Sequence, residues 1–147
     1  MSGDKIEGGC RCGACRYSLA VDRLPPVYAC HCHLCQRWSG SAFSLQALVG
    51  EAQIFVTGPV ATFDHVTEDR VSTQRVCSEC HARLYNTNSR RPGIAVVRAG
   101  TLDRSQELVC RAHIFTDYRQ GWVALDPTLP QWPEAADPAT FIALLST

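Results

Sequence analysis

The residues best suited to chemistry lie between positions 30 and 35, where the sequence reads Cys-His-Cys-His-Leu-Cys. Cys30, Cys32 and Cys35 place three thiols within six residues. Thiolate sulfur is a preferred ligand of zinc, and a structural zinc site normally has four protein ligands, whereas a catalytic site keeps one position open. Three sulfurs with no obvious fourth ligand therefore predict a zinc site that can bind an exchangeable ligand.

Four further cysteines form two pairs, a C-x-C at Cys10 and Cys12 and a C-x-x-C at Cys77 and Cys80. Residues two positions apart point to the same side of an extended chain, and the glycines around the first pair let the backbone bend around an ion. Together the two pairs predict a closed, structural zinc site with four sulfurs. Because such a site closes a long loop, we expect metal binding to contribute to folding.

Spacing alone leaves other arrangements open. The three central cysteines can join one outer cysteine in a single four-sulfur site, or His33 can supply a local fourth ligand, although its ring would crowd against the neighbouring cysteines. A plain zinc ribbon is disfavoured, because only one C-x-x-C stands without an adjoining C-x-C. Cys15 and Cys110 belong to neither site, and we interpret both as buried residues, although the nearness of Cys15 to Cys12 leaves a role as a spare ligand open.

Two residues that follow the central cysteines are candidates for substrate binding. Arg37 is placed to meet an anionic ligand, and the amphipathic ring of Trp38 can form the wall of a pocket. The alternatives are a solvated surface arginine and an ordinary core tryptophan.

The length of 147 residues predicts a single domain over positions 1–147. A net charge of +0 excludes a general electrostatic attraction to nucleic acid or to a membrane surface. The sequence has no signal-like h-region and no apolar run near the ~18 residues of a membrane span, so we expect a cytoplasmic protein. In that reducing compartment nine cysteines are metal ligands more often than disulfides, and their odd number argues against complete pairing.

Short apolar segments separated by turn signals predict a mainly β fold. A short helix or turn is expected over residues 33–38, after the central cysteines. A second helix is expected after Asp137, which can cap it, with Pro138 at its first position and an apolar face that includes Phe141. The predicted strands cover residues 17–21, 27–32, 42–49, 53–57, 60–66, 70–76, 83–86, 94–98 and 108–115.

These motifs, taken in order, resemble the glutathione-dependent formaldehyde-activating family over about residues 7 to 132. The resemblance rests on the segments 9–17, 30–37, 40–43 and 77–80, with His113-Ile114-Phe115, Trp122 and the segment 129–130 further on. It implies an Mss4-like, mainly β fold with two zinc ions. The C-x-C and distant C-x-x-C positions would be the structural site, and Cys30, Cys32 and Cys35 the ligand-exchangeable one. One departure is His81, where the family usually has glycine.

The resemblance implies a carbon–sulfur lyase that condenses formaldehyde with glutathione to S-(hydroxymethyl)glutathione. Zinc deprotonates a bound thiol, and the resulting thiolate can attack a small carbonyl. Two other functions remain open, since fold does not decide function: a zinc-stabilised binding module, which needs only closed sites, and a thiol or metal sensor, since exposed thiolates oxidise readily.

Overall fold

The computed structural model describes residues 5–146, and its chain forms two compact units. The first unit contains the chain up to Pro25 together with Ala47–Glu107, and the second contains Pro26–Gln46 and the chain from Leu108 onward. Within the described residues the chain is mainly β with two short α-helices, which confirms the predicted fold class. The prediction of a single domain stays a prediction.

A small antiparallel sheet in the first unit consists of β1 (Ile6–Gly9), β2 (Arg16–Leu19) and β5 (Ile54–Thr57), in that order. The sequence did not predict β1, because two of its four residues are glycines, which weaken a strand. Gly8 is needed where it stands, since a Cβ there would lie 2.5 Å from the Tyr17 side chain. The buried Tyr17 hydroxyl in turn lies 2.7 Å from Thr101 Oγ1.

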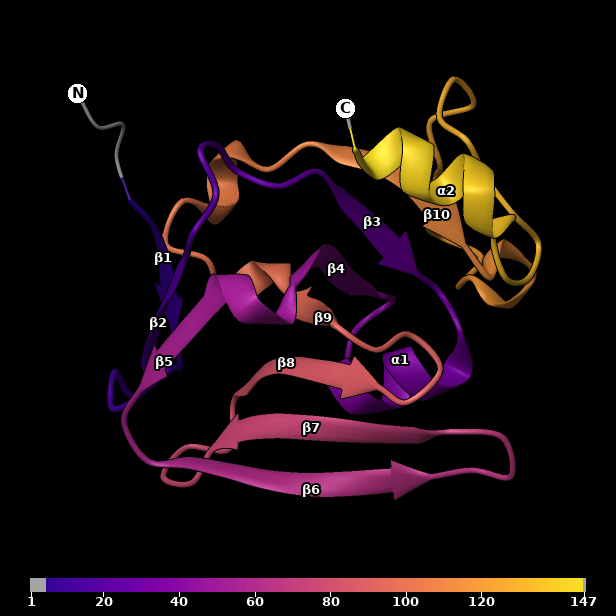
Figure 1. Ribbon diagram of the computed structural model, residues 1–147. Coiled ribbons are helices and arrows are strands. Elements are labelled where there is room, and N and C mark those ends of the chain that lie inside the picture. Colours follow the sequence, from indigo (N-terminus) through magenta and orange to yellow (C-terminus); the bar gives the residue numbers. More distant parts are fainter. Residues whose placement is uncertain (1–4, 147) are drawn as a thin grey trace. The chain divides into compact units, whose positions relative to one another are not determined.

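Four strands of the first unit form an antiparallel meander (Figure 1): β6 (Val60–Val66), β7 (Val71–Cys77), β8 (Arg83–Asn88) and β9 (Ile94–Arg98). The predicted strands 60–66 and 70–76 correspond to β6 and β7. Val76, Leu84 and Val97 bury their side chains in this unit. β7 ends at Cys77, so the meander delivers one predicted metal ligand directly. Three short 3-10 helices lie in the same unit: η1 (Glu51–Gln53), η2 (Ala99–Thr101) and η3 (Ser105–Glu107).

In the second unit, β3 (Val27–Cys30) pairs in parallel with β10 (Cys110–Ile114), and Ile114 lies opposite Cys30. All four residues of β3 are buried. The chain leaves β3 through Cys32, which caps α1 (His33–Ser39). A strand, β4 (Ser44–Gly50), then leads from the second unit into the first. The short η4 (Thr116–Tyr118) follows β10.

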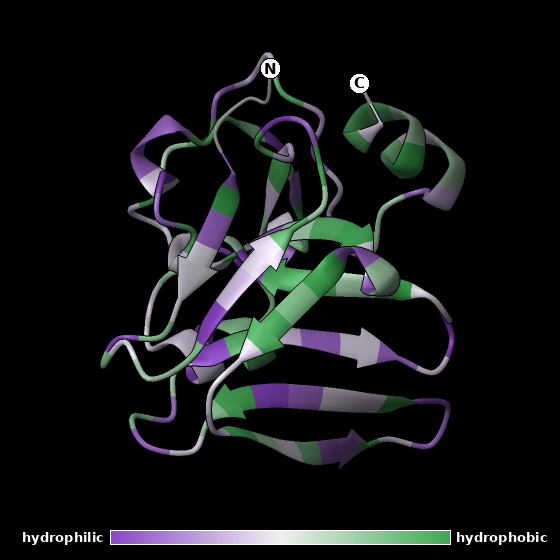
Figure 2. Ribbon diagram, turned by 60° about the vertical axis from the view of Figure 1, so that its left-hand side comes forward, coloured by the Kyte–Doolittle hydropathy of each residue, from purple (hydrophilic) through white to green (hydrophobic). Residues whose placement is uncertain are grey.

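The C-terminal helix α2 (Pro138–Leu145) begins as predicted. The Asp137 carboxylate accepts a hydrogen bond of 2.9 Å from the backbone N–H of Thr140, and Pro138 occupies the first turn. Phe141 is buried edge-on against Tyr28, with ring centroids 4.7 Å apart. Figure 2 shows that the helix is largely hydrophobic, as expected for an element whose stability comes from packing. Over residues 5–146, no helix is both long enough and apolar enough to span a membrane.

Candidate metal centres and an adjoining pocket

The first cysteine cluster brings together the four residues that the spacing assigned to a structural site: Cys10, Cys12, Cys77 and Cys80. Their sulfurs all lie within 4.8 Å of one another. The sulfur of Cys12 is 3.6 Å from that of Cys10 and 3.8 Å from that of Cys77. Four sulfurs at the Zn–S distance of about 2.3 Å around a tetrahedral ion would be about 3.8 Å apart. The cluster therefore fits a zinc ion with four protein ligands.

Turns position these ligands. The backbone N–H of Gly13 donates to the carbonyl of Cys10 at 3.3 Å, and Gly13 has a φ of 83° that favours glycine. This turn, and not the extended chain that the sequence suggested, brings Cys10 and Cys12 together. At the other pair, the Cys77 sulfur accepts hydrogen bonds from the backbone N–H groups of Glu79 and Cys80 at 3.3 and 3.5 Å. These two bonds fix the position of the Cys77 sulfur within the cluster.

His81 closes the second turn in a left-handed conformation, with a φ of 65°. Its N–H donates to the carbonyl of Cys77 at 2.9 Å, so the turn keeps the geometry that a glycine would allow without strain. A residue with a Cβ costs roughly 1–2 kcal/mol in this region. The turn therefore accommodates His81, the departure from the family's usual glycine, at the cost of local strain.

Cys15 lies beside this cluster but is not one of the four clustered ligands. Its side chain is fully buried, and its backbone N–H donates to the Cys10 sulfur at 3.2 Å. Burial raises the pKa of the Cys15 thiol to about 12, so it stays protonated at neutral pH. This agrees with the interpretation of Cys15 as a small buried residue.

The second cluster contains Cys30, Cys32 and Cys35, whose sulfurs also lie within 4.8 Å of one another. The Cys30 and Cys32 sulfurs are 3.6 Å apart, close to the separation expected around zinc. Cys32 caps α1 by accepting a hydrogen bond of 3.4 Å from the Cys35 N–H. The buried Cys35 sulfur accepts one of 3.5 Å from Gln46 Nε2. A strand end and the first turn of a helix thus hold three sulfurs together.

No fourth ligand joins this cluster within the part of the chain that the structure describes. His33 lies outside the group, and its ring instead packs edge-on against Tyr118, with centroids 5.2 Å apart. The two clusters are separate groups, each drawn from one unit, so the single four-sulfur arrangement is not the one formed. The chemistry of the donor set, three thiols in a buried strand end, fits a soft metal ion with one position left for another ligand.

The electrostatics of the three thiols also favour a cation among them. The hydrogen bond from Cys30 lowers the pKa of the Cys32 thiol, and the same bond raises the pKa of the Cys30 thiol. Negative charge therefore concentrates on Cys32, since neighbouring thiolates repel one another in a buried site. A divalent cation would remove that repulsion and stabilise all three as thiolates.

His31 stands between two predicted ligands and is fully buried on the inner side of the loop. Its Nε2 lies 2.9 Å from Nδ1 of His113, which β10 places there. Burial lowers the pKa of both histidines, that of His31 to about 4, so the pair is neutral at pH 7. The Cys110 sulfur lies 4.0 Å from His113 Nε2, and this residue is half-buried, not fully buried as the sequence suggested. The pair was not predicted, because nothing in the sequence shows that β10 and β3 are neighbours.

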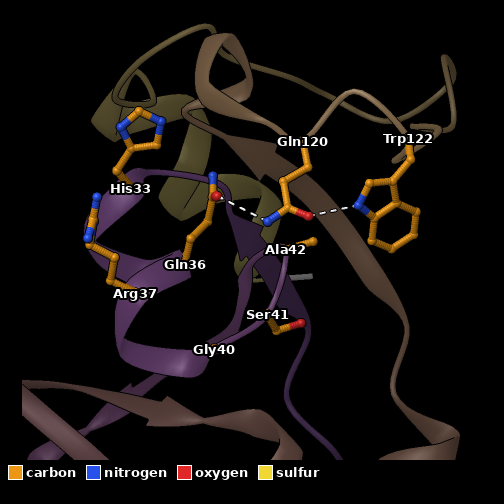
Figure 3. A pocket seen from close by; sticks show the side chains of 8 residues that line it. All are labelled: His33, Gln36, Arg37, Gly40, Ser41, Ala42, Gln120 and Trp122. Atoms are coloured by element: carbon orange, nitrogen blue, oxygen red, sulfur yellow. Dashed lines mark hydrogen bonds between the residues drawn. The ribbon is translucent and has the colours of Figure 1, made fainter.

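A pocket of about 600 Å³ opens beside α1 (Figure 3). Its lining contains a guanidinium, an imidazole, two amides and a hydroxyl, but no carboxylate. The residues are His33, Gln36, Arg37, Gly40, Ser41, Ala42, Gln120 and Trp122. Gln36 follows Cys32 by four positions, so the two lie on the same face of the helix. The pocket therefore lies along the helix whose first turn carries two of the three clustered thiols.

Of the two predicted substrate-binding residues, Arg37 lines this pocket, whereas Trp38 is not among the lining residues. The aromatic wall is Trp122, which comes from the segment after η4. Gln36 and Gln120 were not predicted. Neither glutamine belongs to a sequence motif that indicates ligand binding, and only the fold brings Gln120 close to α1.

The family model for the glutathione-dependent formaldehyde-activating enzyme matches residues 5–118. A protein of Halomonas elongata, whose name describes it provisionally as a glutathione-dependent formaldehyde-activating enzyme, is 25% identical to this chain over 132 aligned residues. The match covers 82% of this chain and 81% of that protein. A Rhodobacter sphaeroides protein of known crystal structure has a similar fold, with a TM-score of 0.54 and 14% sequence identity. The superposition covers 86% of this chain and 98% of that chain. With a family match over most of its length, the chain belongs to the glutathione-dependent formaldehyde-activating family.

Proposed function

We propose that this chain joins a small thiol to a small carbonyl compound, as in the formation of S-(hydroxymethyl)glutathione from glutathione and formaldehyde. It would act as a carbon–sulfur lyase, with zinc in both cysteine clusters. The observation that carries this proposal is a cluster of three sulfurs with no fourth protein ligand, at the start of a helix that also lines a pocket. The reaction needs reduced thiols, so we propose that the protein works in the cytoplasm.

Zinc is the metal that the donor sets favour, because sulfur-only sites with tetrahedral spacing are typical of it. Cys10, Cys12, Cys77 and Cys80 would hold a closed structural ion, and Cys30, Cys32 and Cys35 a second one. When bound at the second cluster, zinc would lower the pKa of a thiol that occupies its remaining coordination position.

The pocket supplies the groups that hold the rest of the thiol substrate. Its volume of about 600 Å³ is far larger than a one-carbon aldehyde needs and falls in the range of sites for drug-sized small molecules. Arg37 and the Ser41 hydroxyl can donate to a carboxylate, and no lining side chain is acidic. Glutathione carries two carboxylates, so its charge suits this pocket.

The reaction itself needs no protein nucleophile. The thiol sulfur forms a bond to the carbonyl carbon, the π electron pair of the carbonyl moves to its oxygen, and the proton lost by the thiol ends on that oxygen. The chain's contribution is to hold the sulfur and its carrier in place, so that the addition becomes effectively intramolecular. The lyase direction is the reverse of these changes.

The test is an exchange experiment with ¹³C-formaldehyde and glutathione, followed by NMR. Zinc-loaded protein should increase the rate of exchange between free formaldehyde and the adduct above the rate without protein. The matched control is Cys35→Ser, which keeps the four-sulfur cluster and the pocket residues. If wild type and Cys35→Ser give the same rate as buffer, the enzyme proposal is wrong, and a zinc-stabilised binding module becomes the better account.

A further inference from the structure

Trp122 has an unusual environment for a tryptophan. Its side chain is 76% exposed, although tryptophan is highly buried on average. The ring is nevertheless held in place, because its Nε1–H donates to Gln120 Oε1 at 2.7 Å. Because Trp122 also lines the pocket, the exposed apolar faces of its ring are available for contact with a ligand there.

A chain of hydrogen bonds connects this ring to the loop of the three cysteines, and Figure 3 shows its first two bonds, from Trp122 to Gln120 and from Gln120 to Gln36. Gln120 Nε2 donates to Gln36 Oε1 at 3.2 Å. Gln36 Nε2 in turn donates to the backbone carbonyl of His31 at 2.7 Å and to that of Tyr118 at 2.9 Å. Since His31 lies between Cys30 and Cys32, these hydrogen bonds run from the second cysteine cluster to the rim of the pocket.

The same bonds define what each side chain can offer a ligand. Both N–H groups of the Gln36 amide are used within the protein, so Gln36 serves to position its neighbours. The single N–H of the Trp122 indole is also used, which leaves only the faces of its ring. Such faces favour methylene groups and the flat planes of peptide amides, and a peptide thiol carries far more of this surface than a small thiol does.

We propose that Trp122 is a specificity-determining residue of the thiol site, and that its indole packs against the part of a peptide thiol beyond the sulfur. Gln120 and Gln36 are positioning residues that hold the ring at a set distance from the three cysteines. This inference rests on the proposed function, because it assumes that the thiol sulfur binds at the cluster of Cys30, Cys32 and Cys35. It predicts a preference for peptide thiols such as glutathione over small thiols such as 2-mercaptoethanol.

The experiment compares the binding of glutathione and of 2-mercaptoethanol to the zinc-loaded protein by calorimetry. Trp122→Ala should lower the affinity for glutathione by about tenfold, a usual effect of removing one aromatic packing partner. It should leave the affinity for 2-mercaptoethanol unchanged. Trp122→Phe keeps an aromatic face but loses the bond to Gln120, so its affinity for glutathione should lie between those of wild type and Trp122→Ala. Phe55→Ala is the matched control, since Phe55 is an exposed aromatic residue of β5 that does not line the pocket.

Failure of this inference and failure of the proposed function give different results. If 2-mercaptoethanol binds but the ratio of the two affinities is the same in wild type and Trp122→Ala, Trp122 does not determine specificity. An equal loss for both thiols would assign Trp122 a structural role and would also overturn the inference. If neither thiol binds wild type, the proposed thiol site is wrong, and this inference falls with it.

Discussion

The sulfurs of Cys12 and Cys77 lie 3.8 Å apart, although 65 positions separate them in the sequence. Cys12 belongs to the turn between β1 and β2, and Cys77 is the last residue of β7. A metal ion between them would join the small sheet of β1, β2 and β5 to the β6–β9 meander, which the chain otherwise connects through the short turn between β5 and β6. By contrast, Cys30 and Cys35 are five positions apart, so an ion at the second cluster closes only a local loop.

This difference predicts unequal effects on stability. Cys77→Ser should lower the free energy of unfolding by on the order of 5 kcal/mol or more, because loss of a structural zinc site removes binding energy that is also folding energy. Cys35→Ser should leave the fold largely intact. Thermal denaturation followed by circular dichroism would measure both. Equal losses in the two variants would contradict the division into a structural and an exchangeable site.

Metal content provides a second prediction. Reduced, freshly purified protein should contain two zinc ions per chain by elemental analysis, since two separate sulfur clusters fit the ion. A mild chelator should remove the ion of the three-cysteine cluster first, because that cluster has fewer protein ligands. Cys35→Ser should retain one ion. Protein that contains no zinc, or four disulfides in place of free thiols, would refute the metal assignment.

The two cysteine clusters could be predicted from the sequence because short motifs such as C-x-C and C-x-x-C bring sulfurs together locally at the spacing that zinc prefers. The β6–β7 hairpin and α2 were also predictable, since alternation, turn residues and the Asp137 cap are local signals. The parallel pairing of β3 with β10 was not, because it joins distant segments and leaves no local pattern. The contact between His31 and His113 depends on that pairing, because His113 lies on β10 and His31 directly follows β3.

The pocket was only partly predictable for the same reason. Arg37 could be assigned because it stands next to the cysteines, and the structure places it in the lining. Gln120 and Trp122 reach the pocket through the fold; Trp122 was singled out only as part of the family resemblance, and no local pattern marks either residue as part of the pocket wall. The strand β1 was hidden by Gly8 and Gly9, which are there for close packing and not for strand propensity.

The left-handed conformation of His81 makes a prediction about stability. His81→Gly should raise the free energy of unfolding by about 1 kcal/mol, because glycine adopts a positive φ without strain, and this gain exceeds the entropy that glycine adds to the unfolded chain. Chemical denaturation of the zinc-loaded protein would measure it. His81→Ala is the control, since alanine keeps a Cβ and should bring little gain. A loss of stability in His81→Gly would show that the histidine side chain itself stabilises the turn.

Arg37 should matter through its charge. Arg37→Ala should lower the affinity for glutathione by about tenfold, the typical effect of losing one exposed charge-assisted contact. Arg37→Lys should recover part of that affinity. The diethyl ester of glutathione lacks both carboxylates and should bind wild type and Arg37→Ala equally well. Calorimetry would provide the affinities. An ester that still distinguishes the two proteins would show that Arg37 acts on some other part of the ligand.

The most direct test of the central claim is the number of protons released when glutathione binds. A thiol that binds as a thiolate at the cluster of Cys30, Cys32 and Cys35 must lose its proton, so affinity should rise with pH until the free thiol ionises, at a pKa of about 8.5 for an ordinary thiol. Calorimetry at pH 7 in two buffers of different ionisation enthalpy measures the release. The account predicts close to one proton per glutathione bound to wild type and no binding to Cys35→Ser. Binding without proton release, or equal binding to Cys35→Ser, would contradict it.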